Sequence, residues 1–249
     1  MIDSIFFFIS LFLFILNEKN RKQKPLIPAL EYYSDSFNLL NGTMNSLIKM
    51  YDKSYVFNYR DLSFHKKFTK YHEDILREFE KNFSTYYLTN PGVFSENFYQ
   101  NNNKYGYFFV NYYGKVNTDK FPILSKLIEN EDIYTCFFSV IDGKKKIHTH
   151  RGPYAGILRY HYTLFSNNDK NDYLKVKNKK LYWMEKKGFL FDDTYYHKLS
   201  KKSRGTRVAI IIDVKRKLPY LLDMLNTYIL SLIDKKKYVN ETREKLLLE

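Results

Sequence analysis

The 249-residue chain contains one cysteine, Cys136. A single cysteine excludes an intrachain disulfide and any zinc site built from several cysteines, so metal chemistry here would depend on histidines and carboxylates. Nine glycines and six prolines are too few for a collagen-like or linker-dominated chain. Because 44% of the residues are hydrophobic, a wholly disordered chain is also excluded, and the length is sufficient for one substantial folded domain.

Acidic residues are scarce beside basic ones, 27 against 41, which gives a formal net charge of +14. Clustered lysines and arginines bind phosphate backbones by releasing counterions. In this chain the basic residues are scattered, and Lys, Asn, Tyr, Phe and Ile are over-used together, as an AT-rich coding sequence would produce. We therefore expect a solvated, lysine-rich surface and no nucleic-acid partner.

The first apolar run is short for a membrane-spanning helix. It covers the twelve residues 5–16, is interrupted only by Ser10 and is followed by a basic flank. As a helix these residues would span about 18 Å, against a hydrocarbon core of about 30 Å. Asp3 stands where a signal peptide has basic residues, and no small-residue cleavage site precedes Asn17. We predict that residues 1–24 form an uncleaved hydrophobic anchor, a single transmembrane helix that holds the protein at a membrane. The basic flank favours a cytosolic domain, but the side of the membrane stays open.

The hydrophobic pattern of the remaining chain changes twice. Residues 25–105 read as a helical or mixed part, in which six apolar side chains recur every three or four positions on one buried helical face: Phe64, Phe68, Tyr71, Ile75, Phe79 and Phe83. Residues 218–249 read as a C-terminal helix with an apolar stripe over 218–235 and a charged tail. The stripe comprises Leu218, Leu221, Leu222, Leu225, Ile229 and Ile233.

Residues 106–217 between these parts are β-rich. Seven short segments contain many aromatic and β-branched residues and are separated by Gly, Asn, Asp and Lys: 107–113, 135–141, 156–165, 173–177, 180–184, 188–191 and 208–214. A short helix is predicted to begin at Pro122. The spacing predicts a mainly β fold with flanking helices, of the sandwich, barrel or jelly-roll kind.

Residues that can carry chemistry collect in four pieces of the β-rich part. These are His148-Thr-His150-Arg-Gly152-Pro153, Leu158-Arg159-Tyr-His161, Phe191-Asp192-Asp193-Thr-Tyr-Tyr-His197, and Arg207 ahead of an apolar strand. Residues two apart on a strand share a face, so each His or Arg pair can point inward together. An inward cluster of such groups is costly unless it binds something. From composition alone, a metal site and a set of structural or surface histidines both stay open.

The four pieces, with Trp183, Glu185 and Gly188, resemble in order and spacing the aspartyl/asparaginyl β-hydroxylase family, and the bacterial lipid A 2-hydroxylases share the pattern. The resemblance covers residues 121–219. It implies that residues 106–217 form a double-stranded β-helix, a jelly-roll or cupin-like catalytic core. It also implies Fe(II) as cofactor, 2-oxoglutarate and O₂ as cosubstrates, and insertion of one oxygen atom into a substrate C–H bond.

The resemblance also implies the metal ligands. His150 and His197 would be the two catalytic ligands of iron. Most non-haem iron oxygenases add a carboxylate, but Gly152 stands where it would be, so the family implies an iron site without a protein carboxylate. Asp192 and Asp193 are rival carboxylates, but the resemblance implies that they support the loop or the ligands rather than bind the metal. His148 is a rival ligand whose role is open.

For 2-oxoglutarate the resemblance assigns the distal carboxylate to Arg207, because a planar guanidinium suits a carboxylate. Ser139 would contact the same cosubstrate, and Arg159 and His161 match the remaining cosubstrate contacts. Trp183 is expected only to pack.

We therefore predict an Fe(II)- and 2-oxoglutarate-dependent dioxygenase that hydroxylates an Asp or Asn side chain in a protein. The alternatives are hydroxylation of a lipid acyl chain at a membrane and a jelly-roll module that binds a ligand without turnover.

Overall fold

The computed structural model describes residues 35–86, 105–129 and 131–248. Within these ranges no helix is long and apolar enough to cross a membrane. The predicted anchor and its transmembrane helix at residues 1–24 lie outside the described residues.

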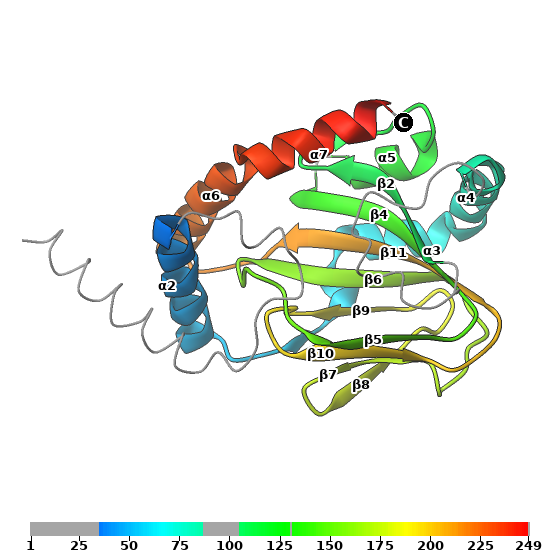
Figure 1. The fold of residues 1–249 in the computed structure, drawn as a ribbon, viewed down its shortest axis with the longest axis horizontal. Helices are drawn as coiled ribbons and strands as arrows, with labels where there is room; N and C mark the ends of the chain where they lie inside the picture. Colours follow the sequence, from blue (N-terminus) through cyan, green and yellow to red (C-terminus); the bar gives the residue numbers. More distant parts are fainter. Residues whose placement is uncertain (1–34, 87–104, 130, 249) are drawn as a thin grey trace, which may run out of the picture.

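Two antiparallel sheets form the centre of the fold (Figure 1). The larger has seven strands in the order β1 (Val56–Phe57), β9 (Gly188–Phe191), β6 (Ile157–Phe165), β11 (Thr206–Lys215), β4 (Ile133–Asp142), β2 (Tyr105–Tyr112) and β3 (Lys115–Val116). The smaller has four, in the order β5 (Lys145–His150), β10 (His197–Lys201), β7 (Tyr173–Val176) and β8 (Lys179–Tyr182). Buried side chains from both sheets, such as Ile141 and Ala209 from the larger and Leu174 and Leu199 from the smaller, pack into one cluster. This arrangement confirms the predicted mainly β, jelly-roll core with flanking helices.

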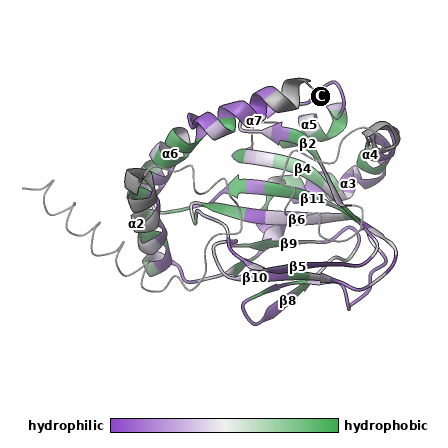
Figure 2. Cartoon of the chain, viewed as in Figure 1, coloured by the Kyte–Doolittle hydropathy of each residue, from purple (hydrophilic) through white to green (hydrophobic). Residues whose placement is uncertain are grey.

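Helices cover the larger sheet and one end of the sandwich. A short 3-10 turn, η2 (Tyr59–Asp61), leads into α3 (Ser63–Lys70), and α3, α4 (His72–Tyr86) and α5 (Pro122–Ile128) pack on the face of the larger sheet turned away from the smaller one. The helices α2 (Asp35–Tyr51), α6 (Tyr220–Asp234) and α7 (Lys237–Leu248) share a second hydrophobic cluster. In Figure 2, α7 is mostly hydrophilic, whereas α6 carries hydrophobic residues.

Alternation along β6 explains how one strand serves both the core and the site. Tyr160 and Tyr162 pack against Phe64 and Phe68 of the helical layer. Side chains of opposite parity point to the other face. Consequently Arg159 and His161 face the space between the two sheets.

The predicted helix over residues 64–83 is divided at Tyr71, so one expectation was wrong. Tyr71 leaves helical geometry with φ −102° and ψ 25°, and its side chain is 37% exposed. Phe64 and Phe79 are buried as expected, because the break falls between the two halves of the stripe. The side chain of Phe83 lies outside the described part of the chain.

The C-terminal stripe is only partly buried. Ile229 and Ile233 are buried, but Leu221 is 72% and Leu225 is 48% exposed. The helix turns a face containing Asn226 toward the domain, where its side chain bonds the Gly156 carbonyl, so these two leucines are left outside. The charged tail beyond it forms the helix α7.

Candidate active site

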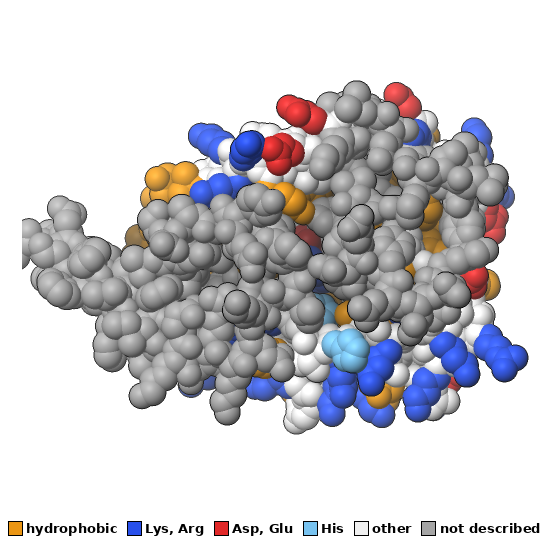
Figure 3. Space-filling model, viewed as in Figure 1, with side chains coloured by type: hydrophobic (Ala, Val, Ile, Leu, Met, Phe, Trp, Pro, Cys, Tyr) orange, Lys and Arg blue, Asp and Glu red, His pale blue; other side chains and the backbone are white. Residues whose placement is uncertain are grey.

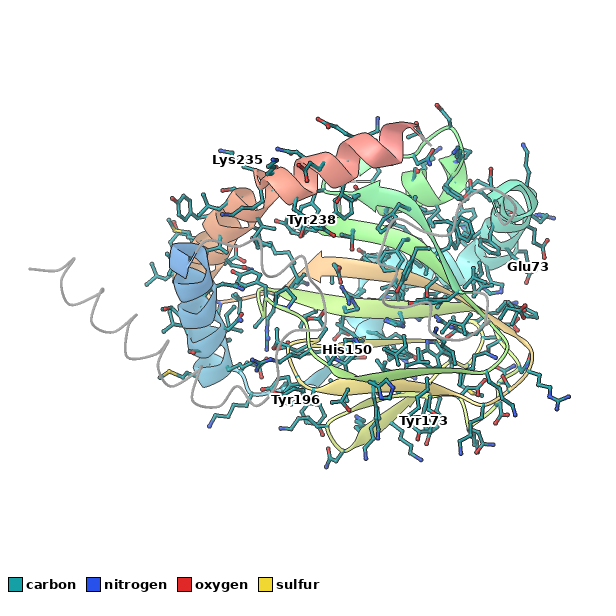
Figure 4. The ribbon with its side chains drawn as sticks, viewed as in Figure 1. Glu73, His150, Tyr173, Tyr196, Lys235 and Tyr238 are labelled. Carbon is teal, nitrogen blue, oxygen red and sulfur yellow. The ribbon has the colours of Figure 1, made fainter. Side chains whose placement is uncertain are left out.

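Two histidines meet where the first two strands of the smaller sheet pair. His150 ends β5, His197 begins β10, and the two residues are register partners. Their ring centroids lie 4.2 Å apart. Figure 4 places His150 between the two sheets. The structure therefore brings together the two residues that the sequence predicts as metal ligands.

Both rings are held in the tautomer that a metal ligand needs. The Nδ1 of His150 lies 2.8 Å from the His148 carbonyl, and the Nδ1 of His197 lies 2.9 Å from the Tyr195 carbonyl. A carbonyl can only accept, so each Nδ1 carries the proton and each Nε2 keeps its lone pair. The His148 side chain is exposed, and this residue acts on the site through its backbone.

Burial keeps the pair neutral. It lowers the pKa of His150, and it lowers that of His197 to about 3 with a further contribution from the neighbouring His150. A neutral imidazole is the form that binds metal. At neutral pH both rings therefore present free electron pairs, with no proton to displace.

The Asp193 carboxylate lies where a side chain at residue 152 would be. A Cβ added at residue 152 would lie 2.3 Å from the Asp193 carboxylate oxygens, and the Gly152 N–H donates to the Asp193 carbonyl at 2.8 Å. The position two residues after His150 is thus glycine because the Asp193 carboxylate fills the place of its side chain. This packing gives a steric reason for a residue that sequence reasoning explained only by family resemblance.

The Asp193 carboxylate is buried and half satisfied. One oxygen, Oδ2, lies 3.2 Å from Arg159 Nη1, while Oδ1 has no hydrogen-bond partner among the described residues. Burial raises the pKa of Asp193 to about 7, despite the opposing effect of Arg159. In the described ranges no group of three His, Cys, Asp or Glu side chains is arranged to hold a metal ion. The histidine pair therefore has a carboxylate nearby without forming a three-residue metal cluster with it.

Arg207 is an unsatisfied cation in the same space. It is 2% exposed, and its Nη2 donates to Ser139 Oγ at 3.2 Å. Its Nε and Nη1 have no partner in the part of the chain that the structure describes. Burial lowers its pKa to about 10, which leaves it charged at neutral pH. Buried donors are rarely left unpaired, so this geometry suits an incoming carboxylate.

Arg159 differs from Arg207 because it already forms ion pairs with carboxylates of this chain. Its Nε and Nη2 lie 2.8 and 2.9 Å from the two carboxylate oxygens of Asp213, in addition to the Asp193 contact. It still lines the cavity and is 28% exposed. Its predicted contact with the cosubstrate stays a prediction.

His161 lies deeper in the site. Its ring stacks on Phe189 with centroids 4.8 Å apart, and its Nδ1 accepts a hydrogen bond from the Trp183 indole at 3.4 Å. Burial and the neighbouring Arg207 hold its pKa well below the usual range. Trp183 also has the Arg207 guanidinium 5.0 Å from its ring centre, so the expectation that it only packs was too narrow.

All six predicted site residues line one cavity of about 290 Å³. Sequence reasoning missed the aromatic wall of this cavity: Tyr105, Tyr107, Phe109, Tyr112, Tyr113, Phe137 and Tyr238. The alternate residues 105, 107 and 109 of β2 were the available signal, because they share a face. Arg151 was also missed as a cavity residue.

The two facing antiparallel sheets define a jelly-roll protein. Its cavity contains a pair of neutral histidines and a buried arginine without a carboxylate partner among the described residues, which together form a candidate metal-dependent active site. The family model described as "Aspartyl/Asparaginyl beta-hydroxylase" matches residues 60–217, more than half of the chain. The chain belongs to this family of hydroxylases, which confirms the resemblance seen in its motifs.

Individual similarities are more distant. The chain is 32% identical over 109 residues to the "Ornithine lipid ester-linked acyl 2-hydroxylase" of Rhizobium tropici. The aligned part is 43% of this chain and 38% of that protein, so the chain spans less than half of the relative's length. Among solved structures, a Pseudomonas putida prolyl-4-hydroxylase has a TM-score of 0.42 at 10% identity and covers 60% of this chain and 88% of its own. A Cupin_2 domain of an XRE family transcriptional regulator from Enterobacter cloacae has a TM-score of 0.33 at 8% identity. The match covers 45% of this chain and 98% of that domain.

Proposed function

We propose that this protein is an Fe(II)- and 2-oxoglutarate-dependent dioxygenase that hydroxylates a C–H bond. The observation that carries the proposal is one cavity that holds both the His150–His197 pair and the two unpartnered donors of Arg207. A metal site alone would need only the histidines. A buried charged guanidinium with vacant donors additionally calls for an anionic ligand.

The residues present fit both groups. His150 and His197 would hold the iron through Nε2, and Arg207 with Ser139 would hold the distal carboxylate of 2-oxoglutarate. When bound, iron together with 2-oxoglutarate and O₂ supplies the oxidant that converts a substrate C–H into C–OH. Two protein ligands leave more of the metal's positions open than the usual three.

The chain's own contribution is to orient and to exclude water. The His148 and Tyr195 carbonyls fix the two rings, and Trp183 orients His161. The aromatic wall would limit the water around a bound cosubstrate, and a lower local dielectric constant strengthens the attraction between Arg207 and a carboxylate. Asp193 can hold or release a proton near neutral pH, beside Gly152 and the histidine pair.

For the substrate, the cavity wall favours an acyl chain. Its side chains are largely aromatic or aliphatic, including Phe137, Ile157 and Ile211, and such a surface suits a hydrocarbon rather than a peptide backbone with unsatisfied polar groups. The name of the Rhizobium tropici relative points to the same chemistry. We therefore propose a lipid acyl chain as the first candidate substrate.

Arg151 keeps the protein substrate as a second candidate. This arginine lines the cavity and contacts the Tyr196 ring at 5.5 Å, so a cation is available for an Asp side chain. Incubation with Fe(II), 2-oxoglutarate and O₂ separates the candidates by mass spectrometry. We expect ornithine lipid to gain one oxygen atom and an Asp/Asn-containing peptide to gain none.

The control is His197→Ala, which should give no oxygen gain with either substrate. Oxygen gain by the peptide alone would overturn the acyl assignment. Absence of turnover with both, and absence of succinate formation, would support the module that binds without turnover.

A further inference from the structure

The outer face of α6 is apolar and has no covering among the described residues. Five large side chains at helical spacing are exposed: Tyr220 (76%), Leu221 (72%), Met224 (53%), Leu225 (48%) and Tyr228 (60%). The other exposed residues of this helix are Thr227 and Ser231. Its two charged side chains, Asp223 and Asp234, are 37% and 44% exposed and pair with Lys215 and Arg243. We call these five residues the α6 face. Large contiguous apolar patches of this kind mark interaction sites in soluble domains.

Positive charge stands at both ends of this helix. Lys217 precedes α6, Lys235 and Lys237 follow it, and all three are exposed. Figure 3 shows hydrophobic side chains gathered at the end of the molecule where Figure 1 places α6, next to Lys and Arg side chains. An apolar helical face flanked by lysines matches a bilayer surface, where hydrocarbon lies beneath anionic headgroups.

The chain enters the described fold at the same place. The helix α2 begins at Asp35, and its first turns lie beside α6 in Figure 1. The 34 residues before Asp35 include the apolar run 5–16 and the basic flank that follows it. A membrane contact made by that segment would hold α6 close to the same bilayer.

We propose that the α6 face docks onto the surface of a bilayer that contains anionic lipids. Its two tyrosines would lie at the headgroup level and its leucines in the outer part of the hydrocarbon. The surface is inferred from exposure and charge, and it does not depend on the proposed function. A bilayer at the α6 face would nevertheless lie close to the proposed active site, because the cavity reaches Tyr238 in α7, directly after α6. Figure 4 shows Tyr238 pointing from α7 toward the sheets.

A single-cysteine probe tests the contact directly. Cys136 is completely buried, so an environment-sensitive thiol probe will label an introduced cysteine selectively. In the full-length chain, the probe is placed at Tyr228→Cys on the α6 face or at Tyr182→Cys on β8. Tyr182 is the matched control, an exposed tyrosine (39%) in the smaller sheet, away from α6 in Figure 1.

Vesicles of phosphatidylcholine and phosphatidylglycerol, with brominated acyl chains as quencher, should quench the probe at Tyr228→Cys and leave Tyr182→Cys unquenched. Vesicle-bound protein with no quenching at Tyr228→Cys would overturn the proposal, as would a failure to bind vesicles. A blue-shifted probe at Tyr228→Cys in the absence of vesicles would mean that the N-terminal segment or a second copy covers the face, and this also overturns it.

A second variant measures the strength of the contact. In the Tyr228→Cys chain, Leu221→Glu with Leu225→Glu should largely abolish quenching of the probe by the same vesicles, because two largely exposed leucines lose their apolar burial. Circular dichroism checks that the variant is folded, and Tyr182→Glu serves as control. Unchanged quenching in the folded double variant would show that the two leucines of the α6 face make no contact with the bilayer.

Discussion

Replacement of Arg207 tests two predictions about one side chain. It should weaken the binding of 2-oxoglutarate, and it should not destabilise the ligand-free protein. The guanidinium is charged, 2% exposed and satisfied only through Nη2, while its Nε and Nη1 have no partner among the described residues. Removal of one partner of a buried charged pair costs about 2–5 kcal/mol, which is about 30-fold to several-thousand-fold in a dissociation constant. We therefore expect Arg207→Ala to weaken 2-oxoglutarate binding within that range. Arg207→Lys should weaken it less, because lysine keeps the charge and loses the planar fork.

Stability of the ligand-free protein should change in the opposite sense. An unpaired buried guanidinium costs desolvation free energy that no ligand repays. Arg207→Met keeps much of the volume and removes that cost, so its thermal midpoint without cosubstrate should equal or exceed that of the wild type. Titration of 2-oxoglutarate into the anaerobic, iron-loaded full-length protein measures affinity, and calorimetry measures stability. Wild-type affinity in Arg207→Ala, with lost affinity in Arg159→Ala, would show that the distal carboxylate belongs to the other arginine.

Three further predictions concern the side of the cavity that contains His150 and His197. His150→Ala or His197→Ala should abolish iron retention, measured by metal analysis after gel filtration, whereas Asp193→Asn should retain iron; equal loss in Asp193→Asn would mean that the ligand set is wrong. Gly152→Ala should displace the Asp193 carboxylate, because the added Cβ would lie 2.3 Å from its oxygens. We expect the free energy of unfolding to fall by at least about 2 kcal/mol. An unchanged free energy of unfolding would refute the packing of Asp193 against Gly152. The pKa of His197 is about 3 in the folded protein and about 6.5 in an unfolded chain, so between these values the unfolded state binds more protons. Stability should therefore fall with decreasing pH, by up to about 1.4 kcal/mol per unit below pH 6.5 from this residue, and a smaller pH slope in His197→Ala is the check.

The sequence was sufficient for the strands that are covered on both faces. Strands such as β4, β6 and β11 are apolar, because helices cover one of their faces and the cavity or the smaller sheet covers the other, and each was predicted within a few residues. The strands β5 and β10 were not among the seven predicted segments. The expectation that His148 and His150 point inward together was wrong for His148, whose side chain is exposed, because the pairing of β5 with β10 shifts register between Ile147 and His150. Their sequences are Lys-Lys-Ile-His-Thr-His and His-Lys-Leu-Ser-Lys, in which the inward positions carry histidine or a single aliphatic residue.

The same two strands carry the two histidines proposed as metal ligands, and this proposed role accounts for the failure of the pattern there. In the proposed function, inward positions that would otherwise be apolar are occupied by ligands. The family motif located His150 and His197 without their strands. Two contacts could be seen only in the folded structure. The Asp193 carboxylate packs against Gly152, 41 positions away in sequence, and the Trp183 indole donates to His161, 22 positions away.

The most direct test of the central claim is the visible absorption spectrum of the full-length protein under anaerobic conditions. Addition of Fe(II) and then 2-oxoglutarate should produce the weak charge-transfer band of a keto acid chelated to iron. The band should be absent in His197→Ala and should require more 2-oxoglutarate in Arg207→Ala. A wild-type protein that retains no iron, or that retains iron and shows no band at saturating 2-oxoglutarate, would contradict the account.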